Sequence, residues 1–71
     1  MTQIDGVFIR DIANNPTNRA MVKAINEVGH VMGLQTVAEY VEDLQTLDIV
    51  RELGIDYAQG HCVGQPYHLQ A

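Results

Sequence analysis

The strongest constraint on the fold is the regular alternation of short apolar runs with amphipathic segments that each stop at a glycine. One segment with helical periodicity stops at Gly33, and the next stops at Gly54, 21 positions later. Short runs that favour β-structure stand before, between and after these segments. Connections of this length join neighbouring parallel strands through right-handed crossovers. The sequence therefore predicts an α/β fold built as a β-α-β-α-β unit.

Two helices are predicted from capping residues and apolar spacing. Asn15 and Pro16 are typical of a helix start, and we expect the first helix over residues 16–32. Its apolar positions follow helical spacing and predict one buried face: Met21, Ala24, Ile25, Val28 and Met32. Acidic residues begin the second helix, expected over residues 43–53. Its predicted buried side consists of Leu44, Leu47, Val50 and Leu53.

Three strands are expected, over residues 3–9, 34–39 and 55–60. The stretch from Gly60 to Pro66 contains two glycines and a proline, and we interpret it as an irregular loop. Residues 67–71, which follow this stretch, show no pattern that predicts a helix or a strand. A chain of 71 residues forms one domain at most, with a small core.

Charge and composition exclude several classes of function. The formal net charge is −5 and the four Lys and Arg residues are spread along the chain, so we expect no DNA or RNA partner. No apolar run approaches the roughly 18 residues of a membrane span. The single Cys62 allows no internal disulfide, and one cysteine with three histidines matches no structural zinc spacing. These features predict a cytoplasmic protein without a membrane segment.

Polar side chains gather where the strands are expected to end. Side chains alternate between the faces of a strand, and this parity brings four polar residues to the face that helices leave open: Gln3, Asp5, Glu39 and Gln59. Their oxygens suit a hard cation such as Mg²⁺ or Mn²⁺. By pattern alone, Glu39 is either a solvated carboxylate or a site residue. Glu42 is either a helix N-terminal carboxylate or a chemical group, and Gln59 and Asp5 either bond the backbone or contact a ligand.

Four motifs follow one another along the chain: Gln3-Ile4-Asp5-Gly6, Phe8-Ile9-Arg10-Asp11-Ile12, Thr36-Val37-Ala38-Glu39-Tyr40-Val41-Glu42 and Asp56-Tyr57-Ala58-Gln59-Gly60. In this order they resemble the C-terminal part of an EAL domain, and the resemblance covers nearly the whole chain. EAL domains are cyclic di-GMP phosphodiesterases. The resemblance implies a TIM-like (β/α)8 barrel, of which this chain would hold strands six to eight and the two helices between them. Such barrels need about 250 residues, so most of the barrel is absent.

The resemblance also implies roles for individual residues. In the family, two divalent cations, Mg²⁺ or Mn²⁺, bind the phosphate oxygens and activate the water that cuts one phosphodiester. Glu39 matches a glutamate that acts as metal ligand or base, and Glu42 matches the glutamate that shapes the active-site loop. Gln59 matches the glutamine near the substrate, and Asp5 matches the aspartate of a Lys-Ile-Asp motif. The expected catalytic residues are thus Glu39, Gln59 and Glu42, with Gln59 and Asp5 as substrate contacts.

Three positions depart from the family pattern. Gln3 stands where the family has a lysine, Tyr40 where it has a glycine, and Val63 where an aromatic residue is frequent. The first departure matters most, because a neutral amide cannot replace the charge that a lysine brings to a phosphate or nucleophile.

These observations support one main hypothesis and two alternatives. The main hypothesis is a fragment of a cyclic di-GMP phosphodiesterase, with cyclic di-GMP and the remainder of the barrel as partners, inactive as an isolated chain. The first alternative is a degenerate EAL domain that serves as a non-catalytic cyclic di-GMP receptor or protein-interaction module, which Gln3 favours. The second alternative is a chain that self-associates, because open sheet edges favour association. Half of a doubly wound nucleotide-binding sheet fails, because no Gly-x-Gly-x-x-Gly or Walker motif follows an expected strand.

Overall fold

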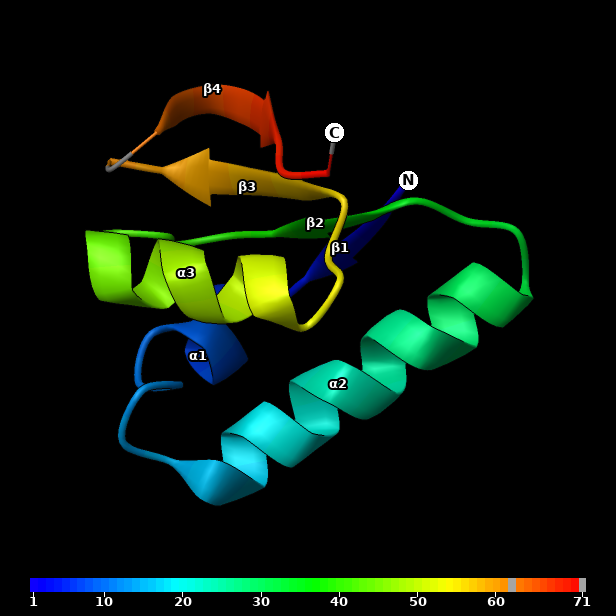
Figure 1. The fold of residues 1–71 in the computed structure, drawn as a ribbon, viewed down its shortest axis with the longest axis horizontal. Helices are drawn as coiled ribbons and strands as arrows, with labels where there is room; N and C mark the ends of the chain where they lie inside the picture. The colour runs from blue at the N-terminus through cyan, green and yellow to red at the C-terminus, as the bar shows by residue number, and fades with distance from the viewer. Residues whose placement is uncertain (62, 71) are drawn as a thin grey trace.

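The computed structural model describes residues 1–61 and 63–70, and its centre is a four-stranded sheet with three helices (Figure 1). The elements are β1 (Thr2–Ile4), α1 (Gly6–Ile9), α2 (Pro16–Val31), β2 (Thr36–Ala38), α3 (Leu44–Glu52), β3 (Tyr57–Gly60) and β4 (Gly64–His68). The strand order is β1-β2-β3-β4. The first two pairings are parallel and the last is antiparallel. The fold is thus α/β, as predicted. Cys62 lies outside the described residues.

Local capping fixes the ends of the two long helices. The side chain of Asn15 accepts a hydrogen bond from the Asn18 N–H at 3.0 Å, and Pro16 follows as the first helical residue. The carboxylate of Asp43 accepts from the Thr46 N–H at 2.8 Å at the start of α3. This backbone hydrogen bond, with a further one from the Thr46 side chain, holds the pKa of Asp43 below its ordinary value.

The core lies between the sheet and its helices. In β1, β2 and β3, the side chains of Ile4, Ala38 and Ala58 point to the helices and are buried. They join one cluster with the buried apolar residues of the helices and loops: Ile9, Ile12, Val22, Val41, Leu47, Ile49, Val50, Ile55 and Leu69. Within residues 1–61 and 63–70, none of the helices has the length and hydropathy that a membrane crossing requires.

The strand predicted over residues 3–9 is wrong in its second half. The structure has a strand only over Thr2–Ile4, followed by the one-turn helix α1 over Gly6–Ile9. Asp5 causes the change, because its carboxylate accepts a hydrogen bond from the Val7 N–H at 3.0 Å and caps the turn. The loop predicted after Gly60 is also wrong in part, because β4 pairs antiparallel with β3 over Gly64–His68.

Most of the predicted buried face of α2 is wrong as well, although Ile25 is partly buried and packs against the core. Met21, Val28 and Met32 are 41%, 59% and 67% exposed, whereas Val22, Asn26 and Gly29 are buried. The helix approaches the sheet along the side with the small residue, where a Cβ on Gly29 would lie 3.1 Å from the Thr36 Cγ2. In α3, Leu44 was predicted to be buried and is 71% exposed. An apolar stripe along one side of α2 therefore faces outward.

A polar network crosses the base of the sheet, at the N-terminal ends of β2 and β3. The Thr36 hydroxyl donates to Asn26 Oδ1 at 2.5 Å, and the Thr36 N–H donates to Asp56 Oδ2 at 2.8 Å. Asp56 Oδ2 also lies 2.7 Å from His30 Nε2. The Asn26 amide donates to the Leu53 carbonyl at 3.0 Å. These contacts bind the end of α2 to both strands, on the edge of the sheet opposite the polar strand ends.

Candidate functional site

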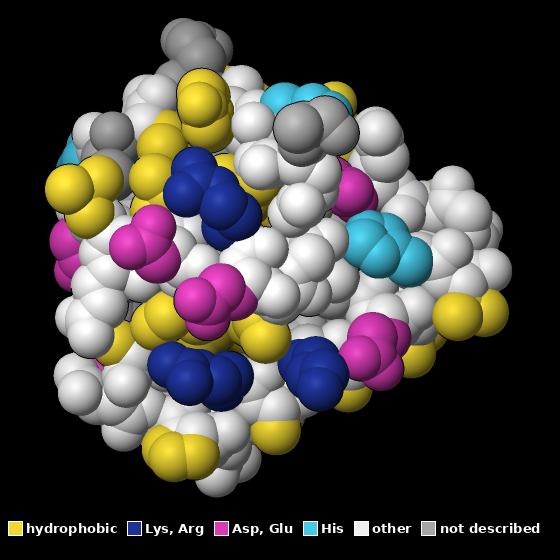
Figure 2. All heavy atoms as spheres, viewed as in Figure 1, with side chains coloured by type: hydrophobic (Ala, Val, Ile, Leu, Met, Phe, Trp, Pro, Cys, Tyr) yellow, Lys and Arg dark blue, Asp and Glu magenta, His cyan; other side chains and the backbone are white. Residues whose placement is uncertain are grey.

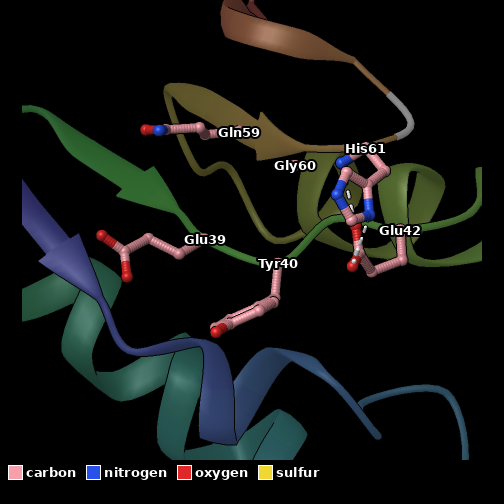
Figure 3. A pocket seen from close by; sticks show the side chains of 6 residues that line it. All are labelled: Glu39, Tyr40, Glu42, Gln59, Gly60 and His61. Atoms are coloured by element: carbon pink, nitrogen blue, oxygen red, sulfur yellow. Dashed lines mark hydrogen bonds and ion pairs between the residues drawn. The ribbon is translucent and has the colours of Figure 1, made fainter.

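A cavity of about 300 Å³ lies where β2 and β3 end (Figure 3). Its lining consists of Glu39, Tyr40, Glu42, Gln59, Gly60 and His61. All six residues belong to the last positions of the two parallel strands or to the turns that follow them. The carboxyl ends of parallel strands are where α/β barrels carry their reactive groups. This cavity is therefore the candidate site.

The ends of β2 and β3 are joined by one backbone hydrogen bond and approach each other closely at Gly60. The Val41 N–H donates to the Gln59 carbonyl at 3.0 Å. The two segments come so close that a Cβ on Gly60 would lie 2.5 Å from both the N and the O of Val41. Gly60 also has φ +151°, which glycine adopts without strain. The spacing of the two strand ends thus depends on the absence of a side chain at Gly60.

Glu39 and Gln59 occupy neighbouring strand ends and extend to the same side of the sheet (Figure 3). Glu39 is half-buried and Gln59 is exposed. The Glu39 N–H donates to the Ile4 carbonyl at 3.3 Å, which connects its position to β1 as well. Both residues were predicted from strand parity to share this face, and the structure brings them to one cavity. A carboxylate and an amide in this arrangement can accept from and donate to one polar ligand.

Glu42 lies on the other side of Tyr40 from these two residues (Figure 3). One carboxylate oxygen accepts from the His61 N–H at 2.8 Å, and the other lies 3.1 Å from His61 Nδ1. Asp43, not Glu42, caps α3, so the alternative of a helix N-terminal carboxylate is not what the structure shows. Glu42 instead connects the turn after β2 to the turn after β3. No sequence pattern pointed to His61 as a site residue beyond its place directly after the Gln59-Gly60 pair.

Tyr40 is the one non-glycine residue with positive φ, at +61°, among the described residues. This conformation costs an L-residue roughly 1–2 kcal/mol. Its ring packs against Gly6, where a Cβ would overlap the ring, and the Arg10 guanidinium carbon lies 5.2 Å from the ring centroid. These contacts join the turn after β2 to α1 and offset the strain.

Asp5 and Gln3 do not line the cavity. The carboxylate of Asp5 is exposed and engaged at the start of α1, as its hydrogen bond to the Val7 N–H shows. Gln3 is exposed on β1, in register with Val37. The four polar residues that parity placed on one face therefore divide into a pair at the cavity and a pair apart from it.

The side chains do not by themselves form a metal site. Among residues 1–61 and 63–70, no group of three or more His, Cys, Asp or Glu side chains is placed to hold a metal ion. Mg²⁺ requires near-octahedral oxygen coordination, which Glu39 and Gln59 cannot complete. The described part of the chain thus offers single oxygen ligands at the cavity and no complete cation site.

Comparison with known proteins decides the family. The sequence profile of the EAL domain matches residues 1–66. The chain belongs to the EAL domain family. The cyclic di-GMP phosphodiesterase PdeB of Shewanella oneidensis is 45% identical over 67 residues, which are 94% of this chain and 8% of that protein. The cyclic di-GMP phosphodiesterase PdeF of Escherichia coli is 39% identical over 69 residues, 97% of this chain and 9% of that protein.

Solved EAL structures contain the same arrangement of strands and helices. The EAL enzyme Bd1971, in a form with cAMP and cyclic di-GMP bound, matches with a TM-score of 0.84 at 28% identity, over 94% of this chain and 18% of its own. The PaMucR phosphodiesterase in complex with cyclic di-GMP matches with a TM-score of 0.83 at 33% identity, over 93% of this chain and 27% of its own. This EAL segment therefore has the fold of a barrel portion, and it spans less than a third of those solved chains.

Proposed function

We propose that this chain is the C-terminal segment of a cyclic di-GMP phosphodiesterase domain, which hydrolyses cyclic di-GMP to the linear dinucleotide. The observation that carries the proposal is the placement of Glu39 and Gln59 on adjacent strand ends at one cavity. The EAL match over residues 1–66 and the names of the relatives support it. The single Cys62 agrees with the reducing cytoplasm as the proposed compartment.

The proposed function assigns one role to each of four residues. Glu39 presents a carboxylate that accepts a proton or serves as one oxygen ligand of a Mg²⁺ or Mn²⁺ ion. Gln59 hydrogen-bonds a polar group of the substrate with its amide. Glu42 shapes the loop through its contacts with His61. Asp5 fixes the turn after β1 with Oδ1, which leaves Oδ2 as the oxygen for a substrate contact.

The remaining cation ligands have to come from outside this chain. The divalent ion supplies Lewis-acid chemistry at the phosphate when bound, but the residues described here do not complete its coordination. We therefore propose that the isolated 71-residue chain neither hydrolyses cyclic di-GMP nor binds it tightly. Formation of the linear product by the purified chain with Mg²⁺ or Mn²⁺ would contradict this proposal.

A chimera tests the function directly. This chain replaces the matching 67-residue segment of Shewanella oneidensis PdeB. We expect metal-dependent hydrolysis of cyclic di-GMP by the chimera, and a loss of about 100-fold or more in kcat for Glu39→Gln. Glu27→Gln is the matched control, because Glu27 is an exposed glutamate on α2. A folded chimera with unchanged activity after Glu39→Gln would contradict the proposed role.

The non-catalytic alternative rests on Gln3, which stands where the family has a lysine and lies exposed on β1. If the chimera binds cyclic di-GMP without turnover, and Gln3→Lys restores turnover, a receptor function is favoured. If the unaltered chimera turns over, the phosphodiesterase is favoured. The chimera and its Gln3→Lys variant thus separate the receptor function from the phosphodiesterase function.

The proposed partner of this chain is the remainder of the barrel. In the described part of the chain, β1 pairs on one side only. Further exposed apolar residues lie on α2 and in the turn after it, and we count them with the β1 edge as the uncovered region: Met21, Val28, Val31, Met32 and Leu34. Figure 2 shows hydrophobic side chains at the surface where α2 runs. Without the preceding strand and helix, the same region favours self-association.

A further inference from the structure

Tyr40 has a rigid, half-exposed aromatic ring beside the candidate site. The residue lines the cavity together with Glu39 and Gln59, and 49% of its surface is exposed. Its side chain extends from the end of β2 toward α1, away from Gln59 (Figure 3). The residue therefore lies between the cavity and α1, and it is not part of the buried core cluster.

The contacts of the ring lie along α1. Gly6 is the first residue of this helix and Arg10 is its C-terminal cap. Residues four apart occupy the same side of a helical turn. Gly6 supports the ring at close range, and the Arg10 guanidinium lies 5.2 Å from its centroid. The ring is thus supported from the helix side, while about half of the surface of Tyr40 stays exposed.

The backbone fixes the direction of this side chain. At φ +61° the chain turns out of the strand, so that Tyr40 and the preceding Glu39 point in different directions (Figure 3). The Val41 N–H, bonded to the Gln59 carbonyl, holds the residue after the turn. The contacts with Gly6 and Arg10 further restrict the ring before a ligand arrives, and such pre-organisation favours binding.

We propose that Tyr40 is a stacking platform for a purine base of the nucleotide that the site binds. This proposal rests on the proposed function, because it assigns a base contact to the same cavity. An aromatic ring stacks on any nucleobase, and one such contact raises affinity by roughly tenfold. Glu39 and Gln59 contact the polar groups of the ligand on one side of the ring. Tyr40 thereby adds a contact that forms only when the ligand carries a base.

An NMR titration of the whole chain tests the platform without turnover. The probe is guanosine 5′-monophosphate, and ribose 5-phosphate is the control that lacks a base. Tyr67 is the internal reference, because it lies on β4 and is 51% exposed, close to the value for Tyr40. We expect the ring protons of Tyr40 to shift with the nucleotide at concentrations about tenfold below those that affect Tyr67. Ribose 5-phosphate leaves the Tyr40 ring unchanged.

Two variants complete the test. Tyr40→Phe keeps the ring and retains the response. Tyr40→Gly removes the ring and places a residue that adopts positive φ without strain, so the fold is kept while base-dependent binding weakens about tenfold. Equal responses of Tyr40 and Tyr67, or equal binding by Tyr40→Gly, would overturn the platform and leave Tyr40 as a clamp for α1 only. An inactive chimera contradicts the proposed hydrolysis, whereas the titration decides the platform separately.

Discussion

The Glu42 carboxylate accepts a hydrogen bond from the His61 N–H at 2.8 Å, across 19 positions of sequence. The imidazole Nδ1 of His61 approaches the other carboxylate oxygen at 3.1 Å. This relationship connects the turn after β2 with the turn after β3, and the cavity lies between these turns. The width of the candidate site therefore depends on the Glu42 side chain. In the described part of the chain, the hydrogen bonds of this side chain go to His61 and not to Glu39 or Gln59.

Removal of the Glu42 carboxylate is expected to loosen this connection. A hydrogen bond of about 1 kcal/mol corresponds to a fivefold change in local opening. We expect Glu42→Ala to raise the hydrogen-exchange rate of the His61 amide about fivefold, and Glu42→Gln, which keeps an acceptor, to raise it less. Glu52→Ala is the control, because Glu52 is exposed at the end of α3. An unchanged His61 exchange rate in Glu42→Ala would mean that the contact does not hold the turn.

The support of Tyr40 by Gly6 predicts a strong coupling between these two positions. A Cβ on Gly6 would overlap the ring, so Gly6→Ala is expected to lower the free energy of unfolding by about 1–3 kcal/mol. In a Tyr40→Gly background the overlap is absent, and the same substitution is expected to cost less than about 1 kcal/mol. Urea denaturation of the four proteins measures the coupling free energy. Additive effects would contradict the packing of the ring on Gly6.

Gly60 and Gly64 form a matched pair at the two ends of the β3–β4 turn. Both have positive φ, but a Cβ on Gly60 would lie 2.5 Å from the Val41 backbone, whereas a Cβ on Gly64 would meet no atom within 4 Å. We expect Gly64→Ala to cost about 1 kcal/mol of stability from backbone strain alone. Gly60→Ala is expected to cost at least about 2 kcal/mol more, because backbone atoms cannot move aside cheaply. Equal losses in thermal denaturation would contradict the close approach of the strands.

Local signals explain which parts of the fold the sequence predicts well. The start of α2 follows from Asn15 and Pro16, whose effects need no distant partner. Strand parity likewise brings Glu39 and Gln59 to one face, because alternation is a property of each strand. The pair at the cavity therefore follows from sequence pattern alone.

Non-local contacts explain two of the three differences between prediction and structure. Apolar spacing on α2 predicts one face, but the structure buries the side with Val22, Asn26 and Gly29, where α2 approaches Thr36 closely. The strand β4 forms because β3 offers an antiparallel edge, which the glycines and proline of the segment do not reveal. Asp5 reads equally well as a ligand or a cap, and its hydrogen bond to the Val7 N–H shows the cap. Contacts between distant residues determined the first two outcomes, whereas the Asp5 cap is a local contact that the sequence pattern does not distinguish from a ligand contact.

The exposed apolar side of α2 predicts concentration-dependent association of the isolated chain. Val31 is 88% exposed and lies near the end of the helix. A lysine there places a charge in the uncovered region without disturbing the core, so Val31→Lys is expected to weaken association about tenfold or more. Gln45→Lys on the exposed side of α3 is the control for added charge. Sedimentation that finds a stable monomer for the unaltered chain would contradict the proposed association.

Asp56 predicts how stability changes with pH. Partial burial acts to raise its pKa, but the Thr36 N–H, the hydrogen bond and charge of His30, and the Thr36 hydroxyl together outweigh this effect and lower the pKa below its ordinary value. A carboxyl group with a lower pKa in the folded state binds its proton more weakly there than in the unfolded chain. Its stabilising effect is therefore present in full above the unfolded pKa and is lost as the pH falls through the folded pKa.

Substitution of Asp56 separates this contribution from the other carboxylates. We expect Asp56→Asn to lower the free energy of unfolding at pH 7 by about 2 kcal/mol, because charge-assisted hydrogen bonds to His30 and Thr36 are lost. The unaltered chain should lose stability as the pH falls below about 4, the ordinary range of an aspartate. Asp56→Asn should show a shallower loss over the same interval, and Asp48→Asn, an exposed control on α3, should keep the original slope. Parallel pH profiles for Asp56→Asn and the unaltered chain would show that the network at the base of the sheet does not lower the pKa of Asp56.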